Sequence, residues 1–273
     1  MSETKPTRAI ELSLDLQATP QEVWNAIAEA DGIVKWFTPE ARVTPGAGGE
    51  IWLSWGGEMS GASKIEIWEP GKHLRTLEAA HPGMAPKVID WYIETAEGGS
   101  TRLRLVHSGF GADAKFDGEY DSTTGGWTTY LLFLENWLNR HRGESVVTIT
   151  ESFIGPMDRG DAWHRLLGPE GFCAEGSFKD LKIGDRFEVR TASGDRFHGT
   201  IRRMQAPGYI GFEIDEWNGA LHAMSCEGCG PGTTWITFQT SFYGSATEQS
   251  ETVRTKWKAM LNGLFAPPAA AGA

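Results

Sequence analysis

An internal repeat constrains the fold of this 273-residue chain more than any other feature of its sequence. Trp24 and Trp163 stand at the same place in two similar segments, each followed eight residues later by a glycine, and they are offset by 139 residues. A later pair, Trp127 and Trp257, is offset by 130 residues, so the second copy is nine residues shorter between these points. Ordered matches whose offset drifts slowly indicate a duplicated domain.

The repeat divides the chain near residues 141–144. We therefore predict two domains, residues 8–142 and residues 145–266, of which the second is a diverged copy of the first. Each would have a length usual for one globular domain, and apolar residues make up 40% of the chain, enough for two cores.

The first half begins with a strand and a capped helix. Residues 8–16 alternate between apolar and polar side chains, as a half-buried strand does. Thr19, Pro20 and Glu22 then form the signature of a helix start, with an N-cap, a proline in the first turn and a capping box. A second short helix is expected over residues 33–37, before a proline ends it.

A series of short strands separated by glycine and proline turns follows, and it predicts an antiparallel meander. The last segment, residues 124–140, carries an apolar stripe at helical spacing. The expected strands are residues 50–55, 62–68, 73–78, 87–94 and 101–108.

This order of elements predicts an α+β fold in which a curved antiparallel sheet wraps around one long C-terminal helix. A strongly curved sheet and a helix leave a gap between them, which is a natural ligand cavity. The acidic residues Asp113, Asp117, Glu119 and Asp121 are expected in a solvated loop before the long helix, where the loop could cover the mouth of the cavity.

Composition argues against several classes of function. The net charge is −11, and no cluster of Lys and Arg offers the basic face of a nucleic-acid binder. No segment approaches the ~18 apolar residues that would cross a membrane. Three cysteines and an N-terminus without an apolar signal region favour a reducing, cytoplasmic location.

No metal site or cofactor motif stands out. Cys226 and Cys229 form a lone Cys-x-x-Cys pair, which we expect between two strands. A structural zinc needs four ligands, and even with His222 as a third the fourth is missing. Nucleotide-binding, metalloprotease and serine-hydrolase motifs are absent from the sequence. We therefore expect no metal, no cofactor and no defined catalytic residue.

His107 is the most suggestive polar residue. It shares a strand face with Leu103 and Leu105, so its ring should point inward. A histidine in an apolar cavity can orient a ligand or transfer protons. The alternative, which we favour, is a structural histidine that holds a neighbouring loop through a hydrogen bond.

Four further aromatic residues are candidates to line the cavity, and the twelve tryptophans of the chain make this plausible as a set. Each one alone is better explained by core packing. Together they favour an apolar or aromatic ligand. The predicted binding residues are Trp36, Trp91, His107, Trp127 and Tyr130.

Two stretches of the first half resemble a known family. They are Thr19–Trp24 followed by Gly32–Phe37, and His107–Phe110 followed by Gly126 and Trp127 at the head of the long helix. They resemble the SRPBCC superfamily (START-like, birch-pollen-allergen-like), and more narrowly the family of the activator of the heat-shock protein 90 ATPase.

The resemblance implies a helix-grip fold with a cavity between sheet and helix, in tandem here. The second half resembles the family more weakly, since it has Thr240 where His107 stands in the first.

The resemblance also implies a range of functions. Our leading expectation is a binder of a small hydrophobic or aromatic molecule with no defined catalysis. The alternatives are a cyclase-like or hydrolase-like enzyme that uses the cavity with His107, and a co-chaperone-like module that binds a protein partner. We expect a monomer whose second copy acts as a pseudo-dimeric partner, or a homodimer.

Overall fold

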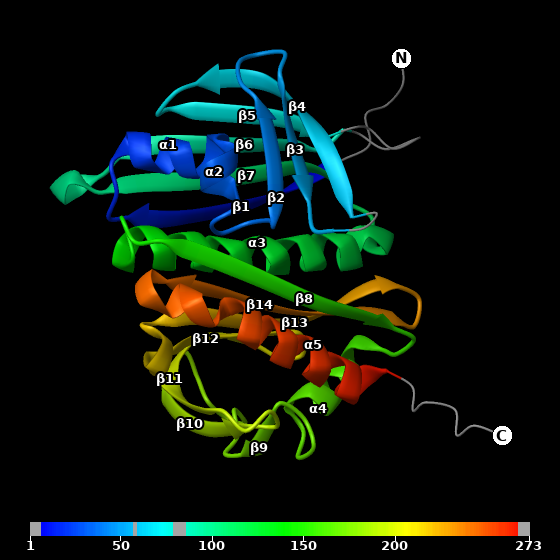
Figure 1. Cartoon of the computed structure of the whole chain (residues 1–273). Coiled ribbons are helices and arrows are strands. Elements are labelled where there is room, and N and C mark those ends of the chain that lie inside the picture. The colour runs from blue at the N-terminus through cyan, green and yellow to red at the C-terminus, as the bar shows by residue number, and fades with distance from the viewer. Residues whose placement is uncertain (1–6, 57–58, 79–85, 267–273) are drawn as a thin grey trace. The chain divides into compact units, whose positions relative to one another are not determined.

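The computed structural model describes residues 7–56, 59–78 and 86–266. The chain separates into two compact units, Met1–Gly143 and Glu144–Ala273, called unit 1 and unit 2 below. Each unit holds one seven-stranded antiparallel sheet and one long C-terminal helix (Figure 1). The expected α+β class with tandem helix-grip units is confirmed.

Unit 1 opens with a strand and two short helices, continues with six strands and ends on the long helix. The capping box predicted at Thr19 and Glu22 is present, with each side chain bonded to the other residue's backbone N–H, and it begins α1. The elements are β1 (Thr7–Leu16), α1 (Pro20–Ala28), α2 (Ala30–Ile33), β2 (Glu40–Thr44), β3 (Glu50–Ser54), β4 (Ser60–Glu69), β5 (His73–Glu78), β6 (Val88–Thr95), β7 (Thr101–Gly111) and α3 (Asp117–Arg140).

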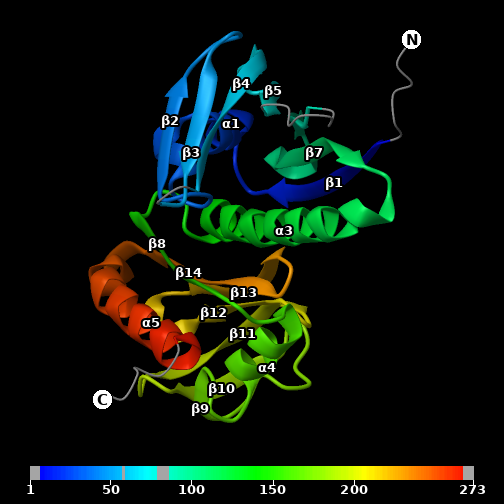
Figure 2. The ribbon, with the colours of Figure 1, turned by 90° about the vertical axis from the view of Figure 1, so that its right-hand side faces the viewer.

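The sheet of unit 1 has the order β1-β7-β6-β5-β4-β3-β2, so the first strand pairs with the last. Figure 2 shows this sheet curving around, with α3 across its open side. The apolar stripe of α3, including Leu131, Leu134 and Leu138, is buried. The core of unit 1 therefore lies inside the curve, between the sheet and the helices.

Unit 2 repeats the plan with one helix fewer. Its sheet has the order β8-β14-β13-β12-β11-β10-β9, which matches unit 1 strand for strand. The elements are β8 (Val146–Gly155), α4 (Arg159–Leu167), β9 (Cys173–Glu175), β10 (Arg186–Thr191), β11 (Arg196–Gln205), β12 (Tyr209–Ile214), β13 (Ala220–Gly230), β14 (Thr233–Tyr243) and α5 (Ser250–Phe265).

Gly32 in unit 1 and Gly171 in unit 2 show that the repeat extends to local backbone packing. A Cβ on Gly32 would lie 2.0 Å from the carbonyl oxygen of Asn25, and one on Gly171 would lie 2.2 Å from that of Leu166. In both units the chain thus turns back against the end of its first helix so closely that only glycine fits. This close packing explains why a glycine follows the tryptophan at the same spacing of eight residues in both units.

One strand of unit 1 was not predicted, and the expected bounds of two of its helices are wrong. Strand β2 was not anticipated, because Glu40–Thr44 is a sheet edge whose side chains alternate only between exposed and half-buried. The second helix lies at Ala30–Ile33 rather than 33–37, and residues 34–37 form hydrogen-bonded turns. Helix α3 begins at Asp117 rather than Thr124.

The early start of α3 also corrects the expected acidic loop. Asp117, Glu119 and Asp121 lie in the first turns of the helix, where carboxylates interact favourably with the helix dipole. Only Asp113 precedes the helix, next to a short 3-10 turn at Ala114–Phe116. Gly126 and Trp127 accordingly lie well inside α3 and not at its head.

The cysteine pair is placed differently from the expectation. Cys226 and Cys229 both lie on β13, which runs to Gly230 despite its glycines, so they do not lie between strands. Cys226 is buried, whereas Cys229 is exposed and lies where the pairing register of β13 with β14 shifts. In the part of the chain that the structure describes, no group of His, Cys, Asp or Glu is arranged to hold a metal.

No helix among the described residues is long and apolar enough to cross a membrane.

Candidate functional site

The interior of unit 1 holds a small cavity with three of the predicted binding residues in its wall. Trp36, Trp91 and Trp127 come from the turn after α2, from β6 and from α3, and all three are buried. The cavity has a volume of about 50 Å³. Its wall consists of Ile27, Ile33, Trp36, Phe37, Ile51, Leu53, Ser63, Leu74, Thr76, Ile89, Trp91 and Trp127.

Phe37 stands at the centre of an aromatic cluster on one side of this cavity. Its ring stacks on Trp36 and on Trp127, with centroids 5.1 Å away in both cases. The rings of Trp55 and Tyr130 pack nearly perpendicular to the Phe37 ring, with centroids 5.3 and 4.7 Å from its centroid. Phe37, Trp55 and Tyr130 are partly exposed, so this is the side of the cavity nearest to solvent.

Tyr130 contributes to the site without lining the cavity. Its hydroxyl accepts a hydrogen bond of 3.0 Å from the indole N–H of Trp55. This bond fixes the two partly exposed rings against each other beside Phe37. Sequence reasoning included Tyr130 but missed Trp55, which follows the end of β3.

Two hydroxyl groups in the cavity wall were also missed. Ser63 shares a strand face with the fully buried Ile65, and Thr76 shares one with the fully buried Leu74. The alternation of each strand was thus the signal that could have found them, because side chains two residues apart point to the same face. These hydroxyls give an otherwise apolar wall two hydrogen-bonding groups.

The cavity wall carries no charge in the part of the chain that the structure describes. A volume of about 50 Å³ is enough for one or two water molecules, while a benzene-sized cavity measures ~150 Å³. The cavity therefore suits an uncharged group, but at its present size it can hold only part of an aromatic molecule.

His107 is buried behind Trp127 and does not line the cavity. Its Nδ1 accepts a hydrogen bond of 3.0 Å from the indole N–H of Trp127. Because an indole N–H can only donate, the neutral His107 ring carries its proton on Nε2. Nε2 lies 3.7 Å from a carboxylate oxygen of Glu78.

The surroundings of His107 keep the ring neutral. Burial, and to a lesser extent the positive charge of Lys87, lower the pKa of His107 to about 3. A second proton, on Nδ1, would also face the N–H of Trp127 donor to donor. A hydrogen bond from Trp127 on α3 therefore holds the His107 ring, in place of the loop contact expected from sequence.

Unit 2 rebuilds this hydrogen bond with other residues. Trp257 takes the place of Trp127, and its indole N–H donates to Thr240 Oγ1 over 3.0 Å. Thr240 Oγ1 lies 2.8 Å from Nδ1 of His222, its cross-strand neighbour on β13. Unit 1 has Ile89 at the place of His222, so the histidine of the pair stands on the adjacent strand in unit 2.

The interior of unit 2 is filled with aromatic side chains. His222 is fully buried and stacks on Phe172, and Phe178 stacks on Phe212. Burial lowers the pKa of His222 to about 3, so this ring is neutral as well. Bulky rings thus pack the interior that in unit 1 contains the cavity.

A larger hollow of about 930 Å³ lies at the surface of unit 2, between α4 and residues 173–181. Trp163, Phe178 and Met204 contribute apolar surface to it, but the residues from Ala174 to Ser177 are exposed. The hollow is large, whereas the cavity of unit 1 is small and has three buried tryptophans in its wall.

Two polar clusters lie away from these hollows. In unit 1, Asp90 is buried, and burial alone would raise its pKa. Its carboxylate accepts two hydrogen bonds from Nε and Nη2 on one edge of the Arg75 guanidinium and also bonds to His73, and these contacts lower the pKa of Asp90 overall. These residues pair across β5 and β6. The cluster is best explained as a cross-strand ion pair.

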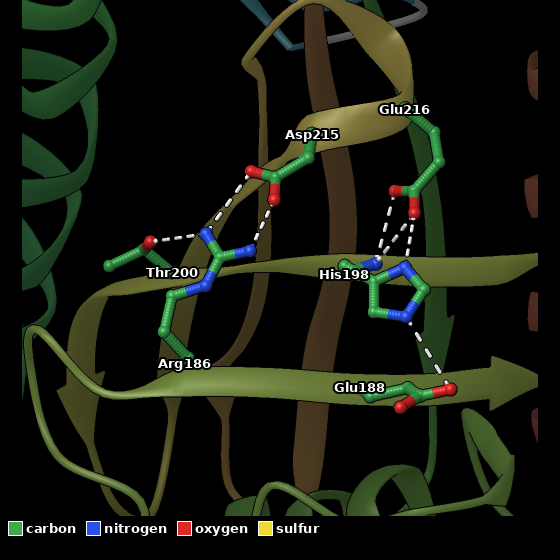
Figure 3. A network of polar contacts seen from close by, with 6 residues as sticks. All are labelled: Arg186, Glu188, His198, Thr200, Asp215 and Glu216. Atoms are coloured by element: carbon green, nitrogen blue, oxygen red, sulfur yellow. Dashed lines mark hydrogen bonds and ion pairs between the residues drawn. The ribbon is translucent and has the colours of Figure 1, made fainter.

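The second polar cluster is an exposed network on β10 and β11 of unit 2 (Figure 3). The ring of His198 lies between Glu216 and Glu188, and its hydrogen bond with Glu216 raises the pKa of His198. Arg186 pairs with Asp215 beside it. Every charge in this network has an opposite charge next to it, so the network ties β10 and β11 to the 3-10 turn Asp215–Trp217 that follows β12.

Comparisons with known proteins agree with the resemblance expected for the first half. Residues 17–139 match the family described as activator of Hsp90 ATPase homolog 1-like protein. No curated protein matches the chain.

Among solved structures, the chain is similar to the Aha1 dimer from Colwellia psychrerythraea, with 23% identity, 50% of this chain and 99% of that chain covered, and a TM-score of 0.44. It is similar to the di-domain ARO/CYC BexL from the BE-7585A biosynthetic pathway, with 15% identity, 96% and 100% covered, and a TM-score of 0.44. It is also similar to DynU16 from the dynemicin biosynthetic locus, with 17% identity, 93% and 96% covered, and a TM-score of 0.41.

Proposed function

We propose that unit 1, which matches the activator of Hsp90 ATPase homolog 1-like family, binds a small, uncharged, hydrophobic or aromatic molecule in its cavity. The observation that carries the proposal is the wall of the cavity. Trp36, Trp91 and Trp127 surround it with Phe37, and no described wall residue is charged.

The electrostatics of the cavity support an uncharged ligand. Taking an ionised carboxylate into apolar surroundings without a partner is strongly unfavourable. The hydroxyls of Ser63 and Thr76 can instead donate a hydrogen bond to a hydroxyl or carbonyl oxygen of the ligand, or accept one from a hydroxyl. The preferred ligand would therefore be an apolar ring with one neutral polar substituent.

The chemistry of His107 supports binding rather than catalysis. A general base works best with a pKa near the working pH, whereas the pKa of His107 is lowered to about 3. Its Nδ1 is also engaged by Trp127, and the ring lies behind the wall of the cavity. We therefore rank the enzyme alternative below the binding protein.

Matched aromatic probes test this proposal. We expect 2-naphthol to bind the full chain at pH 7 and 2-naphthoate to bind at least ~10-fold more weakly, because the carboxylate loses its hydration without gaining a partner. Isothermal titration calorimetry measures both dissociation constants. Equal affinity for the two probes would contradict an uncharged site.

Two variants distinguish binding in the cavity of unit 1 from binding in the surface hollow of unit 2. Ser63→Leu places extra carbon atoms in the cavity and should weaken 2-naphthol binding at least ~10-fold while all the tryptophans stay in place. Ala174→Trp obstructs the surface hollow of unit 2 and should leave binding unchanged. The reverse pattern would move the site to unit 2 and end the proposal for unit 1.

A second candidate is a protein-interaction module acting on a heat-shock protein 90 ATPase. The family match over residues 17–139 and the filled interior of unit 2 favour it. On this proposal the full chain should raise the rate of ATP hydrolysis by that ATPase, and Ser63→Leu should raise it equally because a surface interaction does not need the cavity. A rate unchanged by an excess of the chain would exclude this candidate.

A further inference from the structure

The size of the cavity raises a question about how it could hold an aromatic molecule. A ring the size of benzene needs ~150 Å³, three times the roughly 50 Å³ present. Most wall residues come from strands and helices and are deeply buried. Phe37 is partly exposed, as Leu53, Ser63 and Ile89 are, but those three lie on strands whereas Phe37 lies on the turn after α2.

The ring of Phe37 already sits where a flat aromatic ligand would be held best. Trp36 and Trp127 stack on it, with interplanar angles of 19° and 23°. Trp55 and Tyr130 meet it edge-on, at 88° and 83°. Aromatic rings prefer stacked and edge-to-face neighbours, and here one ring has both kinds at once.

We propose that the ring of Phe37 occupies the aromatic subsite of unit 1 and that the ligand is a flat, uncharged aromatic molecule that replaces it. The inference rests on the proposed function and gives that function a ligand class and a specificity-determining residue. When Phe37 turns out, the space of its ring joins the cavity behind it, which Phe37 itself helps to line.

The exchange is feasible because the same contacts are made before and after. A ligand ring between Trp36 and Trp127 recovers the stacking that the phenyl ring loses, and its outer part can extend into the cavity toward Ser63 and Thr76. An aliphatic chain would not recover the stacked and edge-to-face contacts. The competition also predicts a weakened apparent affinity in the native chain, since the open state must be populated first.

Removal of the competing ring tests the inference directly. We expect Phe37→Ala in the full chain to bind 2-naphthol at least ~10-fold more tightly than the native chain, with Phe37→Leu between them. The indole N–H of Trp55, which bonds to Tyr130 at this site, provides a local NMR signal for the titration. Phe37→Leu keeps an apolar side chain in place and covers the case in which the alanine variant folds poorly.

Phe178→Ala is the matched control. Phe178 is a buried phenylalanine that also stacks in an aromatic cluster, but in unit 2. This variant should leave the titration of the Trp55 signal unchanged. If it tightens binding as much as Phe37→Ala does, the effect is not local to the subsite and the inference is lost.

The outcomes separate this inference from the proposed function. Native binding of 2-naphthol that neither Phe37 variant tightens would overturn the inference and leave the proposed function standing. Binding by the Phe37 variants alone would support the subsite and count against a ligand for the native chain. No binding by any of the three would overturn both.

Discussion

Lowering the pH from 7 to 4 is expected to reduce the free energy of unfolding of each unit by about 3 kcal/mol through one buried histidine. In unit 1 this is His107 and in unit 2 it is His222, and the pKa of each is lowered to about 3 in the folded chain.

The sign follows from where the proton binds. In the unfolded chain each histidine binds a proton near the ordinary pKa of 6.5, whereas in the folded chain the pKa of each is about 3. The unfolded state therefore binds more protons throughout this window, and stability falls as the pH falls through it. Above pH 6.5 both rings are neutral in both states, and the contribution is fully present.

Urea denaturation at several pH values measures this effect, and His222→Phe identifies its source in unit 2. The slope of stability against pH gives the number of protons taken up when unit 2 unfolds, and this number should be smaller by about one in the variant. The Thr240 hydroxyl also loses its hydrogen-bond partner, which lowers stability at every pH. The exposed His164 serves as control, and His164→Ala should keep the native slope. A ring of His222 that titrates near pH 6.5 in NMR spectra of the folded chain would contradict the prediction.

Trp257→Ala is expected to destabilise unit 2 by about 3–5 kcal/mol. The indole is fully buried among Phe172, Phe197, Phe238 and His222, so its loss leaves a large hole in a filled interior. It also removes the N–H that bonds to Thr240. The midpoint of urea unfolding gives the change, if the slope of the transition is unchanged.

Trp52→Ala provides the comparison for a tryptophan at the surface. Trp52 is half-buried on β3 with the Arg42 guanidinium above its ring, and its removal should cost only about 1 kcal/mol or less. If Trp257→Ala proves as mild as Trp52→Ala, the interior of unit 2 is not the packed aromatic core described above.

The sequence by itself determined the architecture of this protein. The matched tryptophans of the two copies predicted the tandem units, and the alternation of residues 8–16 with the signature at Thr19 and Glu22 predicted how unit 1 begins. These predictions succeeded because they depend on near neighbours in the chain. The period of a strand, the cap of a helix and the spacing of a repeat are all local.

Local patterns also indicated which side chains point inward, but not what they meet there. Trp36, Trp91 and Trp127 were expected in one cavity and do share its wall, while His107 lies behind it. The edge strand β2 escaped prediction because its side chains lack a buried apolar face. The start of α3 was missed because its first turns are polar and face solvent.

Only the tertiary structure decided the size of the cavity and the stacking of Phe37 on two indoles. It also decided that the buried histidine is His107 on β7 in unit 1 and His222 on β13 in unit 2. Each of these depends on how rings from distant elements fill one shared volume. A periodic pattern specifies the direction of a side chain but not the space left by its neighbours. That space exists only once the sheet has curved and the helices have closed it.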